Sequence, residues 1–388
     1  MTKANEPAPR HQLEERISFN RPSLVGNELT YVRDAIERGH ISGDGSYTRR
    51  CEEVLSQLMA GARVLLTTSC THALEMSALL LDIQPGDEVI VPSFTFVSAA
   101  NAFVLRGARP VFIDSRPDTL NMDERLIEGM ITERTRAIVA MHYGGVGCEM
   151  DGIMTVARRA GVKVIEDNAH GLFGAYRGRP LGTFGDMSTL SFHETKNIFC
   201  GEGGALILND SSLVARAEIL REKGTDRSRF FRGEVDKYTW VDLGSSYVAS
   251  DMLAAFLLGQ LEKRDEIQAA RRRIWDRYHA GLADWANGRG AQLAHVPPHC
   301  ASSHHLFYLL MTSLEERQAL IAHLRDRGIQ AIFHYIPLHA SAMGKQFGGR
   351  LGDCPVAESV SDRIVRLPFF SSLTEEQQSR VIDAVRTF

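Results

Sequence analysis

From residue 18 to about residue 210, short apolar segments alternate with amphipathic ones, and this alternation constrains the fold more than any other feature. Several apolar segments are continuous and β-branched, which is typical of strands buried on both faces of a parallel sheet. The expected strands are Arg63–Leu66, Glu88–Val91, Pro110–Ile113, Thr135–Met141, Val162–Glu166, Met187–Phe192 and Ala205–Leu208.

Helices are expected between these strands, and glycine follows several of them. Gly39, Gly107 and Gly161 stand where a helix commonly ends in a left-handed residue. Strands and helices that alternate along the chain predict an α/β fold with a mostly parallel sheet and helices on both faces. The expected helices are Asn27–Arg38, Thr71–Leu81, Phe96–Arg106, Asp123–Met130 and Met150–Ala160.

The pattern changes after residue 250, and 388 residues exceed the usual size of one domain. Asp251 to about Leu282 is predicted as one long helical stretch with a break near Gly259. A smaller unit should follow, with strands His305–Met311 and Ile329–Phe333 and helices Leu314–Arg327 and Thr374–Val385. We therefore expect a polar tail over 1–17, a large domain over 18–250, and a connecting helix with a small C-terminal α+β domain over 251–388.

Charge and cysteine content narrow the functional class. With 44 basic and 48 acidic residues, the chain is nearly neutral, which does not favour nucleic acid or an anionic membrane as a partner. Its six cysteines form no CxxC pair, so no metal site is predicted and the thiols should be reduced. The N-terminus lacks the apolar segment of a signal peptide. These features predict a cytoplasmic enzyme that acts on small molecules.

The segment SFHETKNIFCGEGG, residues 191–204, contains the strongest chemical signal. Lys196 follows a predicted strand and precedes a glycine-rich turn, where burial would lower its pKa and make the neutral amine available for a Schiff base. The competing interpretation is a solvated loop lysine. Glu166 and Asp167 end another predicted strand, at the edge where open α/β sheets bind ligands. A carboxylate there either holds a cationic ring nitrogen or caps a helix.

Three further segments fit a phosphorylated ring. Ser69 and Thr71 begin a helix that follows a strand, which makes an anion site or an ordinary helix cap. Phe94 and Phe96 offer an aromatic ring for stacking, although both suit a core. His170 is a candidate for the same pocket or a structural histidine. A phosphate cradle, a stacking ring, a carboxylate and a Schiff-base lysine together indicate pyridoxal 5'-phosphate (PLP) as the cofactor.

The same segments resemble the DegT-type sugar-nucleotide aminotransferases, which are PLP-dependent enzymes of the aspartate aminotransferase fold, or fold type I. The likeness runs from about residue 20 to the C-terminus. Within the family, the chain looks most similar to members that make dTDP-4-amino-4,6-dideoxygalactose for cell-surface glycans. The matching segments are GDGSYTRR, TTSCTHALEM, PGDEVIVPSFTFVSAANA, VIEDNAHG, SFHETKN with GEGG, and HYIPLH.

The resemblance assigns a role to each matching residue. Lys196 would carry the cofactor as a Schiff base, Asp167 would pair with the pyridine nitrogen, and His170 would lie near the 3-hydroxyl. Phe96 would stack on the ring, and the phosphate would be bound by Ser191 and by the backbone amides of Cys70 and Thr71. The family also implies a homodimer in which each active site is built from both subunits.

The chain departs from the family pattern at two places. Many members have glycine or alanine where Cys70 stands, so Cys70 is expected to contribute only its amide. Many have Asn-x-Arg where this chain has Ser246, Tyr247 and Val248. Ser246 retains one donor for the phosphate of the partner subunit's cofactor, whereas Val248 cannot replace the arginine.

The resemblance implies that the amino acceptor is a nucleoside-diphosphate 4-keto-6-deoxyhexose, most simply dTDP-4-dehydro-6-deoxyglucose, with L-glutamate as amino donor and ping-pong kinetics. Arg229 and Arg232 lie in a basic, aromatic segment that suits a diphosphate or a solvated loop. The HYIPLH segment adds Tyr335 and His339 as candidate substrate contacts.

Two alternative functions remain. Related PLP-dependent sugar dehydratases have histidine in place of the lysine, so Lys196 argues against that reaction. A non-catalytic DegT-like regulator would not need the lysine–aspartate pair.

Overall fold

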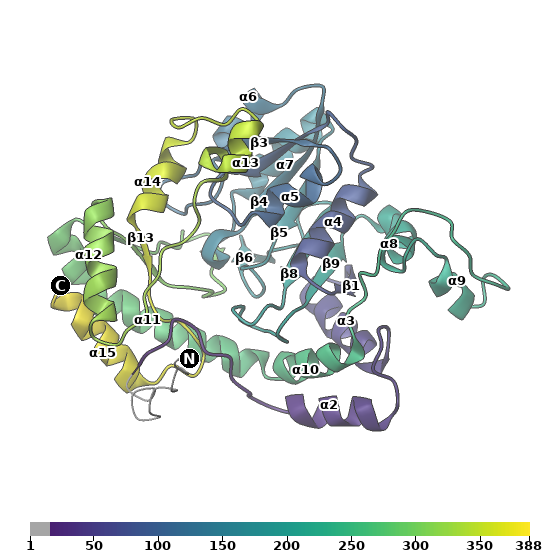
Figure 1. Ribbon diagram of the computed structural model, residues 1–388, viewed down its shortest axis with the longest axis horizontal. Coiled ribbons are helices and arrows are strands. Elements are labelled where there is room, and N and C mark those ends of the chain that lie inside the picture. Colours follow the sequence, from purple (N-terminus) through teal and green to yellow (C-terminus); the bar gives the residue numbers. More distant parts are fainter. Residues whose placement is uncertain (1–15) are drawn as a thin grey trace, which may run out of the picture.

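The computed structural model describes residues 16–388, and its centre is a seven-stranded sheet with the order β1-β9-β8-β5-β4-β2-β3 (Figure 1). β9 runs antiparallel to both of its neighbours, whereas the pairs from β8 to β3 are parallel. All seven predicted strands are present, and each bound lies within one residue of its prediction. They are β1 (Arg63–Thr67), β2 (Glu88–Pro92), β3 (Arg109–Ile113), β4 (Thr135–Met141), β5 (Lys163–Asp167), β8 (Met187–Ser191) and β9 (Gly204–Leu208).

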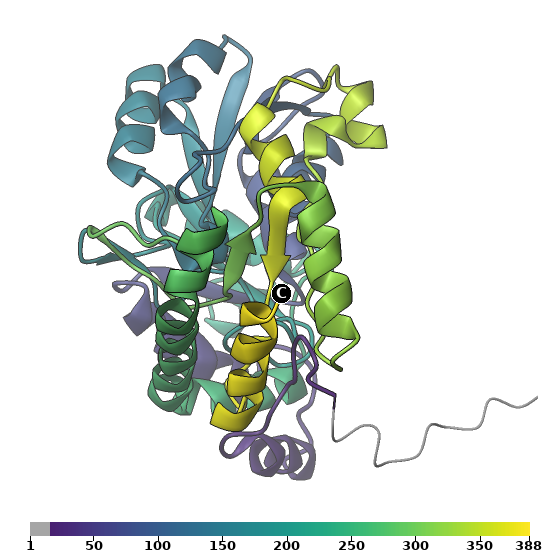
Figure 2. The ribbon, with the colours of Figure 1, turned by 90° about the vertical axis from the view of Figure 1, so that its left-hand side faces the viewer.

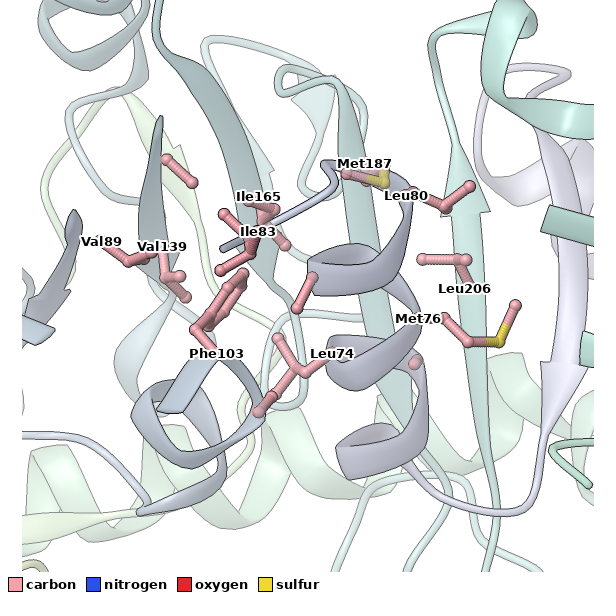
Figure 3. Close-up of a cluster of buried hydrophobic side chains, with 14 of the residues drawn as sticks. Leu74, Met76, Leu80, Ile83, Val89, Phe103, Val139, Ile165, Met187 and Leu206 are labelled. Carbon is pink, nitrogen blue, oxygen red and sulfur yellow. The ribbon is translucent and has the colours of Figure 1, made fainter. Parts of the chain in front are cut away.

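Helices cover both faces of this sheet, as predicted. Alternate strand residues face opposite sides: Leu65 packs in one core cluster, while Val64 and Leu66 pack in another. The first cluster lies under α4 (Cys70–Leu80), α5 (Ser98–Val104) and α8 (Val214–Arg221), and Figure 3 shows α4 lying across strand residues such as Met187 and Leu206. The opposite face is covered by α2 (Glu28–Glu37), α3 (Ser46–Leu58), α6 (Ile127–Met130), α7 (Met150–Ala160) and α10 (Asp251–Glu262).

The α3 helix was not predicted, and the structure explains why its sequence lacks a start signal. Its N-cap is Gly45, which has no side chain for capping. Asp251, about 200 positions later in the chain, provides the cap: its carboxylate accepts hydrogen bonds from the backbone N–H of Thr48 (2.7 Å) and of Tyr47 (3.3 Å). A cap donated from so far away leaves no local pattern in the sequence.

The long helical stretch after residue 250 is broken later than predicted. α10 ends at Glu262 and α11 (Arg264–Arg289) begins after Lys263, rather than near Gly259. Gly259 lies inside α10, where a Cβ atom would approach the backbone nitrogen of Glu28 to 2.7 Å. Glycine is required there by the close contact with α2, and it does not end the helix.

The C-terminal part forms a smaller unit, which Figure 2 shows facing the viewer. Its sheet has the order β10 (Gln292–Leu293), β12 (Tyr308–Leu310) and β13 (Ile364–Arg366). The predicted strand Ile329–Phe333 was wrong: only isolated bridges join Ile329 to Ile17 and Ile332 to Arg366. Its helices are α12 (Leu314–Arg325), α13 (Ala342–Gln346), α14 (Pro355–Arg363) and α15 (Glu375–Arg386).

The remaining elements are short. A three-stranded sheet contains β6 (Ala175–Tyr176), β7 (Arg179–Pro180) and β11 (Cys300–Ala301), and α9 (Arg227–Phe231) projects from the body (Figure 1).

Most of the predicted tail, residues 1–15, lies outside the described residues. Ile17 is buried in the C-terminal core. No helix within residues 16–388 is long and apolar enough to cross a membrane. The domain boundaries at 18, 250 and 251 stay predictions.

Candidate active site

The two carboxylates at the end of β5 have different roles because neighbouring strand residues point to opposite faces of the sheet. Glu166 is buried and accepts hydrogen bonds from the backbone N–H groups of Gly182, Phe184 and Gly185 at 2.6–2.8 Å. It also accepts one from Nε2 of His142 at 2.9 Å. These contacts satisfy Glu166 within the protein, so it anchors a loop rather than binding a ligand.

Asp167 is buried on the other face of the sheet, where fewer hydrogen-bond donors stabilise its negative charge. Its Oδ1 accepts a hydrogen bond from the backbone N–H of Ala169 at 3.2 Å. Burial raises the pKa of this carboxyl group, while the Ala169 N–H and the positive charge of Lys196 act in the opposite direction. A buried carboxylate with so few donors favours a cationic group beside it.

Lys196 lies in the irregular segment between β8 and β9, which backbone hydrogen bonds hold in place. The segment closes through bonds from Glu194 N–H to the Gly201 carbonyl and from Cys200 N–H to the Phe192 carbonyl, both 2.9 Å. Burial lowers the pKa of the Lys196 ammonium, and the Cys70 thiol and Asp167 carboxylate partly oppose that shift. A lysine with a lowered pKa has more of its amine in the neutral, nucleophilic form.

The N-terminus of α4 forms a cradle beside this lysine. Ser69 caps the helix by accepting a hydrogen bond from His72 N–H at 3.1 Å, and the Thr71 and Ser98 hydroxyls lie 2.8 Å apart. Gly204, which pairs with Ser191 across the sheet, lies so close that a Cβ atom there would be 2.4 Å from Cys70 N. The glycine therefore lets the start of β9, beside the end of β8, approach the helix N-terminus, where backbone N–H groups suit a phosphate.

Aromatic side chains line the other side of the pocket. Phe94 is buried, whereas Phe96 is 56% exposed with its ring centroid 6.3 Å from that of Tyr335. His170 accepts a hydrogen bond at Nδ1 from Gly144 N–H (3.4 Å), and its Nε2 lies 3.5 Å from the Tyr335 hydroxyl. Burial, together with Lys196 and Arg366, lowers the pKa of His170 well below its ordinary value, so the ring is neutral.

Comparison with known proteins agrees with this geometry. Residues 22–386 match the model of the DegT/DnrJ/EryC1/StrS aminotransferase family. The chain belongs to this family. It is 35% identical to GDP-perosamine synthase of Caulobacter vibrioides over 378 residues, which cover 95% of this chain and 97% of that protein. It is 31% identical to a spore coat polysaccharide biosynthesis protein of Bacillus subtilis over 381 residues, with 95% and 96% covered.

A solved relative, Spr1654 of Streptococcus pneumoniae in its PMP form, has a TM-score of 0.89 at 29% identity and covers 96% of this chain and 98% of its own. The same protein has been solved in a PLP form. The chain of 388 residues described here is thus a PLP-dependent sugar-nucleotide aminotransferase with the predicted fold. The pocket fits the cofactor, because it combines a lysine of lowered pKa, a buried carboxylate and a helix N-terminus that β9 can approach closely only with glycine at position 204.

Most of the predicted cofactor residues lie together. Asp167 pairs with Thr189 between β5 and β8, Thr189 contacts the Cys70 thiol, and His170 contacts Tyr335. The charges of Lys196 and Asp167 act on the pKa of their neighbours there, which agrees with one shared pocket. The Cys70 thiol donates to the Thr189 hydroxyl (3.4 Å), which leaves its backbone amide as the group available to a phosphate. The cofactor roles of all the predicted residues stay predictions: Cys70, Thr71, Phe96, Asp167, His170, Ser191, Lys196 and Ser246.

Four other predicted residues do not join the pocket within this subunit. Arg229 and Arg232 both pair with Glu234, at 3.2 and 2.7 Å, and lie around α9 at the end of the molecule farthest from α12 and α15 (Figure 1). His339 is buried, with its ring nitrogens bonded to Ser93 (2.5 Å) and Glu358 (2.9 Å). Ser246 is exposed.

The structure also adds residues that sequence reasoning missed. His334 bonds to the Tyr143 hydroxyl (2.6 Å) and stacks on Tyr335 at 3.7 Å between centroids. Arg366 donates twice to the Phe333 carbonyl, at 3.2 and 3.0 Å, and within residues 16–388 it forms no ion pair. The sequence could have indicated Arg366, because it is the one charged residue in the apolar segment from Ile364 to Phe370.

Proposed function

We propose that the chain transfers an amino group from L-glutamate to C4 of a nucleoside-diphosphate 4-keto-6-deoxyhexose. The observation that carries this proposal is the pairing of Lys196, whose pKa is lowered, with the buried Asp167 at the strand ends of a pocket that fits PLP. A dTDP-linked sugar, giving dTDP-4-amino-4,6-dideoxygalactose, is the candidate from the sequence resemblance. A GDP-linked sugar is the second candidate, because the Caulobacter relative is a GDP-perosamine synthase.

Different residues around the pocket are proposed to bind the cofactor and to transfer the proton. PLP, when bound, supplies an electron sink for the bond broken at the substrate carbon. Asp167 would pair with the protonated ring nitrogen, Phe96 would cover the ring, and the N-terminus of α4 with Ser191 would hold the phosphate. Burial lowers the pKa of Lys196, so its amine Nζ, once free, would serve as the base that removes the proton from the substrate carbon and as the acid that gives it back.

Arg366 is suited to the amino donor. Its guanidinium donates to the carbonyl of Phe333, the residue before His334, whose ring stacks on Tyr335, so it lies beside the pocket. No carboxylate among residues 16–388 pairs with it, and its charge lowers the pKa of His170, His305 and His334. Glutamate carries two carboxylates, and the guanidinium fork binds such groups in a bidentate manner. We propose that Arg366 receives one of them.

The nucleotide end of the acceptor is proposed to contact a second subunit. Arg229 and Arg232 lie too far along the molecule to serve the pocket of their own chain, yet they sit among exposed aromatic residues. Phe231 and Trp240 are 70% and 77% exposed. A homodimer with shared active sites would cover this apolar surface and bring the two arginines to the partner's substrate.

Two other functions have less support. A sugar dehydratase of this fold would have histidine in place of Lys196, and here the lysine is present and buried in the pocket. A regulator without catalysis would have no use for a lysine of lowered pKa beside a buried carboxylate.

Product analysis tests the proposal. The purified enzyme is incubated with L-glutamate and either the dTDP-linked or the GDP-linked 4-keto-6-deoxyhexose, and the products are resolved by mass spectrometry and NMR. The proposal expects an amino sugar nucleotide and an equal amount of 2-oxoglutarate with one of the two. Loss of water from the sugar without amino transfer would instead identify a dehydratase.

A further inference from the structure

The rings of His305 and His170 form a stack beside the cofactor pocket. Their centroids are 4.1 Å apart and their planes differ by 22°. Both residues are buried, and they come from distant parts of the chain: His170 follows β5, while His305 lies in the segment that leads to β12. The stack therefore joins the large sheet to the C-terminal unit at the site.

Asn197, the residue after Lys196, fixes which nitrogen of His305 carries the proton. Its side-chain Nδ2 donates to the Ser303 carbonyl at 2.7 Å, so its Oδ1 must be the atom that faces His305. His305 Nδ1 lies 2.9 Å from Oδ1 and must donate to it, because a carbonyl oxygen only accepts. The lysine-bearing segment and the His305 ring are thus tied by a directional bond.

The backbone around His305 is held under strain in this position. His304 has φ +50, a left-handed conformation that is unfavourable for a residue with a Cβ atom. Buried Arg271 donates to the carbonyl groups of His304 and His305, and the Ser303 hydroxyl donates to the His170 carbonyl at 2.5 Å. Strain that is maintained by this many contacts is typical of functional sites.

His170 has a defined tautomer that depends on these surroundings. Because Gly144 N–H points at Nδ1, the proton of the neutral ring lies on Nε2, the nitrogen that also faces Tyr335. Lys196, Arg271, Arg366 and His170 all disfavour a positive charge on His305, as burial does. The stack therefore consists of two neutral rings whose hydrogen-bonding edges are both fixed.

We propose that His305 is a positioning residue that holds the ring plane of His170 through stacking, so that Nδ1 stays aligned with the Gly144 N–H that keeps the proton on Nε2, and that Asn197 links this stack to the Lys196 segment. His305 acts through His170 and Asn197 and does not itself react. The proposal rests on the PLP enzyme that the family establishes and not on the identity of the sugar.

Two substitutions separate the two contacts. His305→Phe keeps a ring for stacking but loses the bond to Asn197, and His305→Gln keeps a donor but loses the stack. His279→Phe is the matched control, since the His279 ring in α11 stacks on Trp275, with 5.1 Å between centroids, rather than on His170. The ¹⁵N signals of the His170 ring, assigned by their absence in His170→Gln, report its tautomer in the protein with and without PLP.

We expect the wild type and His279→Phe to show the Nε2-protonated pattern, and at least one His305 variant to show a mixture of tautomers. That variant should convert PLP to its amino form with glutamate at least tenfold more slowly, through kcat rather than KM. His305→Phe and His305→Gln spectra that both keep the wild-type His170 pattern would overturn the proposal, even with lower activity, because His305 would then act only on overall folding.

Discussion

At the scale of single residues, Lys196 differs from the other lysines near the sheet in its electrostatic surroundings. Burial lowers the pKa of Lys196, whereas Lys163 pairs with Asp186 at 2.7 Å, which raises the pKa of Lys163. Lys223 is exposed beside Glu222. Only an unprotonated amine attacks an aldehyde, so we propose Lys196, rather than Lys163 or Lys223, as the residue that holds PLP.

Borohydride reduction of the PLP-loaded enzyme should therefore fix the cofactor to Lys196. Peptide mapping by mass spectrometry checks this result, with Lys196→Ala as the control that should bind no reducible cofactor. A stable adduct on Lys163 or Lys223 in the wild type would show that the site is misassigned.

Asp167→Asn is expected to slow transamination by at least a hundredfold, because the ring nitrogen loses its anionic partner and each tenfold requires only about 1.4 kcal/mol. The change is nearly isosteric, so the fold should persist. Asp167 also raises the pKa of Lys196, so its loss should move the acid limb of PLP capture to lower pH. Single-turnover absorbance across pH measures both effects.

The control for that substitution is Asp326→Asn, at a surface aspartate whose side chain is 70% exposed. Normal turnover by PLP-loaded Asp167→Asn would eliminate the proposed role of the carboxylate.

Three buried histidines near the pocket make stability depend on pH. Burial lowers the pKa of His170, His305 and His334 well below 6.5 in the folded protein. As pH falls below about 6.5, the unfolded chain binds protons that the folded chain does not, so the free energy of unfolding should decrease. Denaturant titrations at pH 7.5 and 5.5 measure this, and His305→Phe should show a smaller decrease than the wild type. Equal decreases would contradict neutral burial of His305.

At the scale of the elements, local sequence patterns predicted the strands and the helix ends that depend on neighbouring residues. The seven strands of the large sheet were found within a residue because each is a short apolar segment, and Gly39, Gly107 and Gly161 all adopt the left-handed φ expected after a helix. Asp167 ends β5 and Lys196 follows β8, close to the strand ends where the sequence predicted them, and their roles toward the cofactor stay predictions.

Long-range contacts explain what the sequence did not reveal. The cap of α3 comes from Asp251, and Gly259 is needed because α10 packs closely against α2. Glu166 and Asp167 differ because different backbone groups lie on the two faces of β5. The stack of His305 on His170 brings together residues separated by 135 positions, so no local spacing could have indicated it.

Gly204 in β9 provides a test of the element that shapes the cradle. Gly204→Ala would place a Cβ atom 2.3 Å from the Ser69 carbonyl carbon, so β9 or α4 must shift. Overpacking of this kind costs about 1–3 kcal/mol, and PLP should also dissociate faster. Denaturant midpoints and dialysis of the bound cofactor measure these effects.

Gly129→Ala is the matched control, because nothing lies within 4 Å of a Cβ atom at that position. Wild-type cofactor retention by Gly204→Ala would show that the close approach of β9 to α4 does not form the phosphate site.

At the scale of the whole molecule, the proposed dimer explains why Arg229, Arg232 and the exposed aromatic residues lie so far from their own pocket. If the active sites are shared, a Lys196→Ala chain mixed with a Ser246→Ala chain should recover part of the activity, since one site of the hybrid is intact. Neither variant alone should match that recovery. A fully active monomer in sedimentation velocity would exclude a shared site.

The central claim is that Lys196 and Asp167 serve amino transfer to a sugar nucleotide, and one single-turnover measurement tests it most directly. Enzyme converted to the amino form of the cofactor with glutamate is freed of 2-oxoglutarate and mixed with a dTDP- or GDP-linked 4-keto-6-deoxyhexose. We predict that the absorbance of the aldehyde form returns with one of these sugars, and that Lys196→Ala shows no return. Absorbance that returns with simple 2-oxo acids but with neither sugar nucleotide would contradict the account and identify an amino-acid aminotransferase.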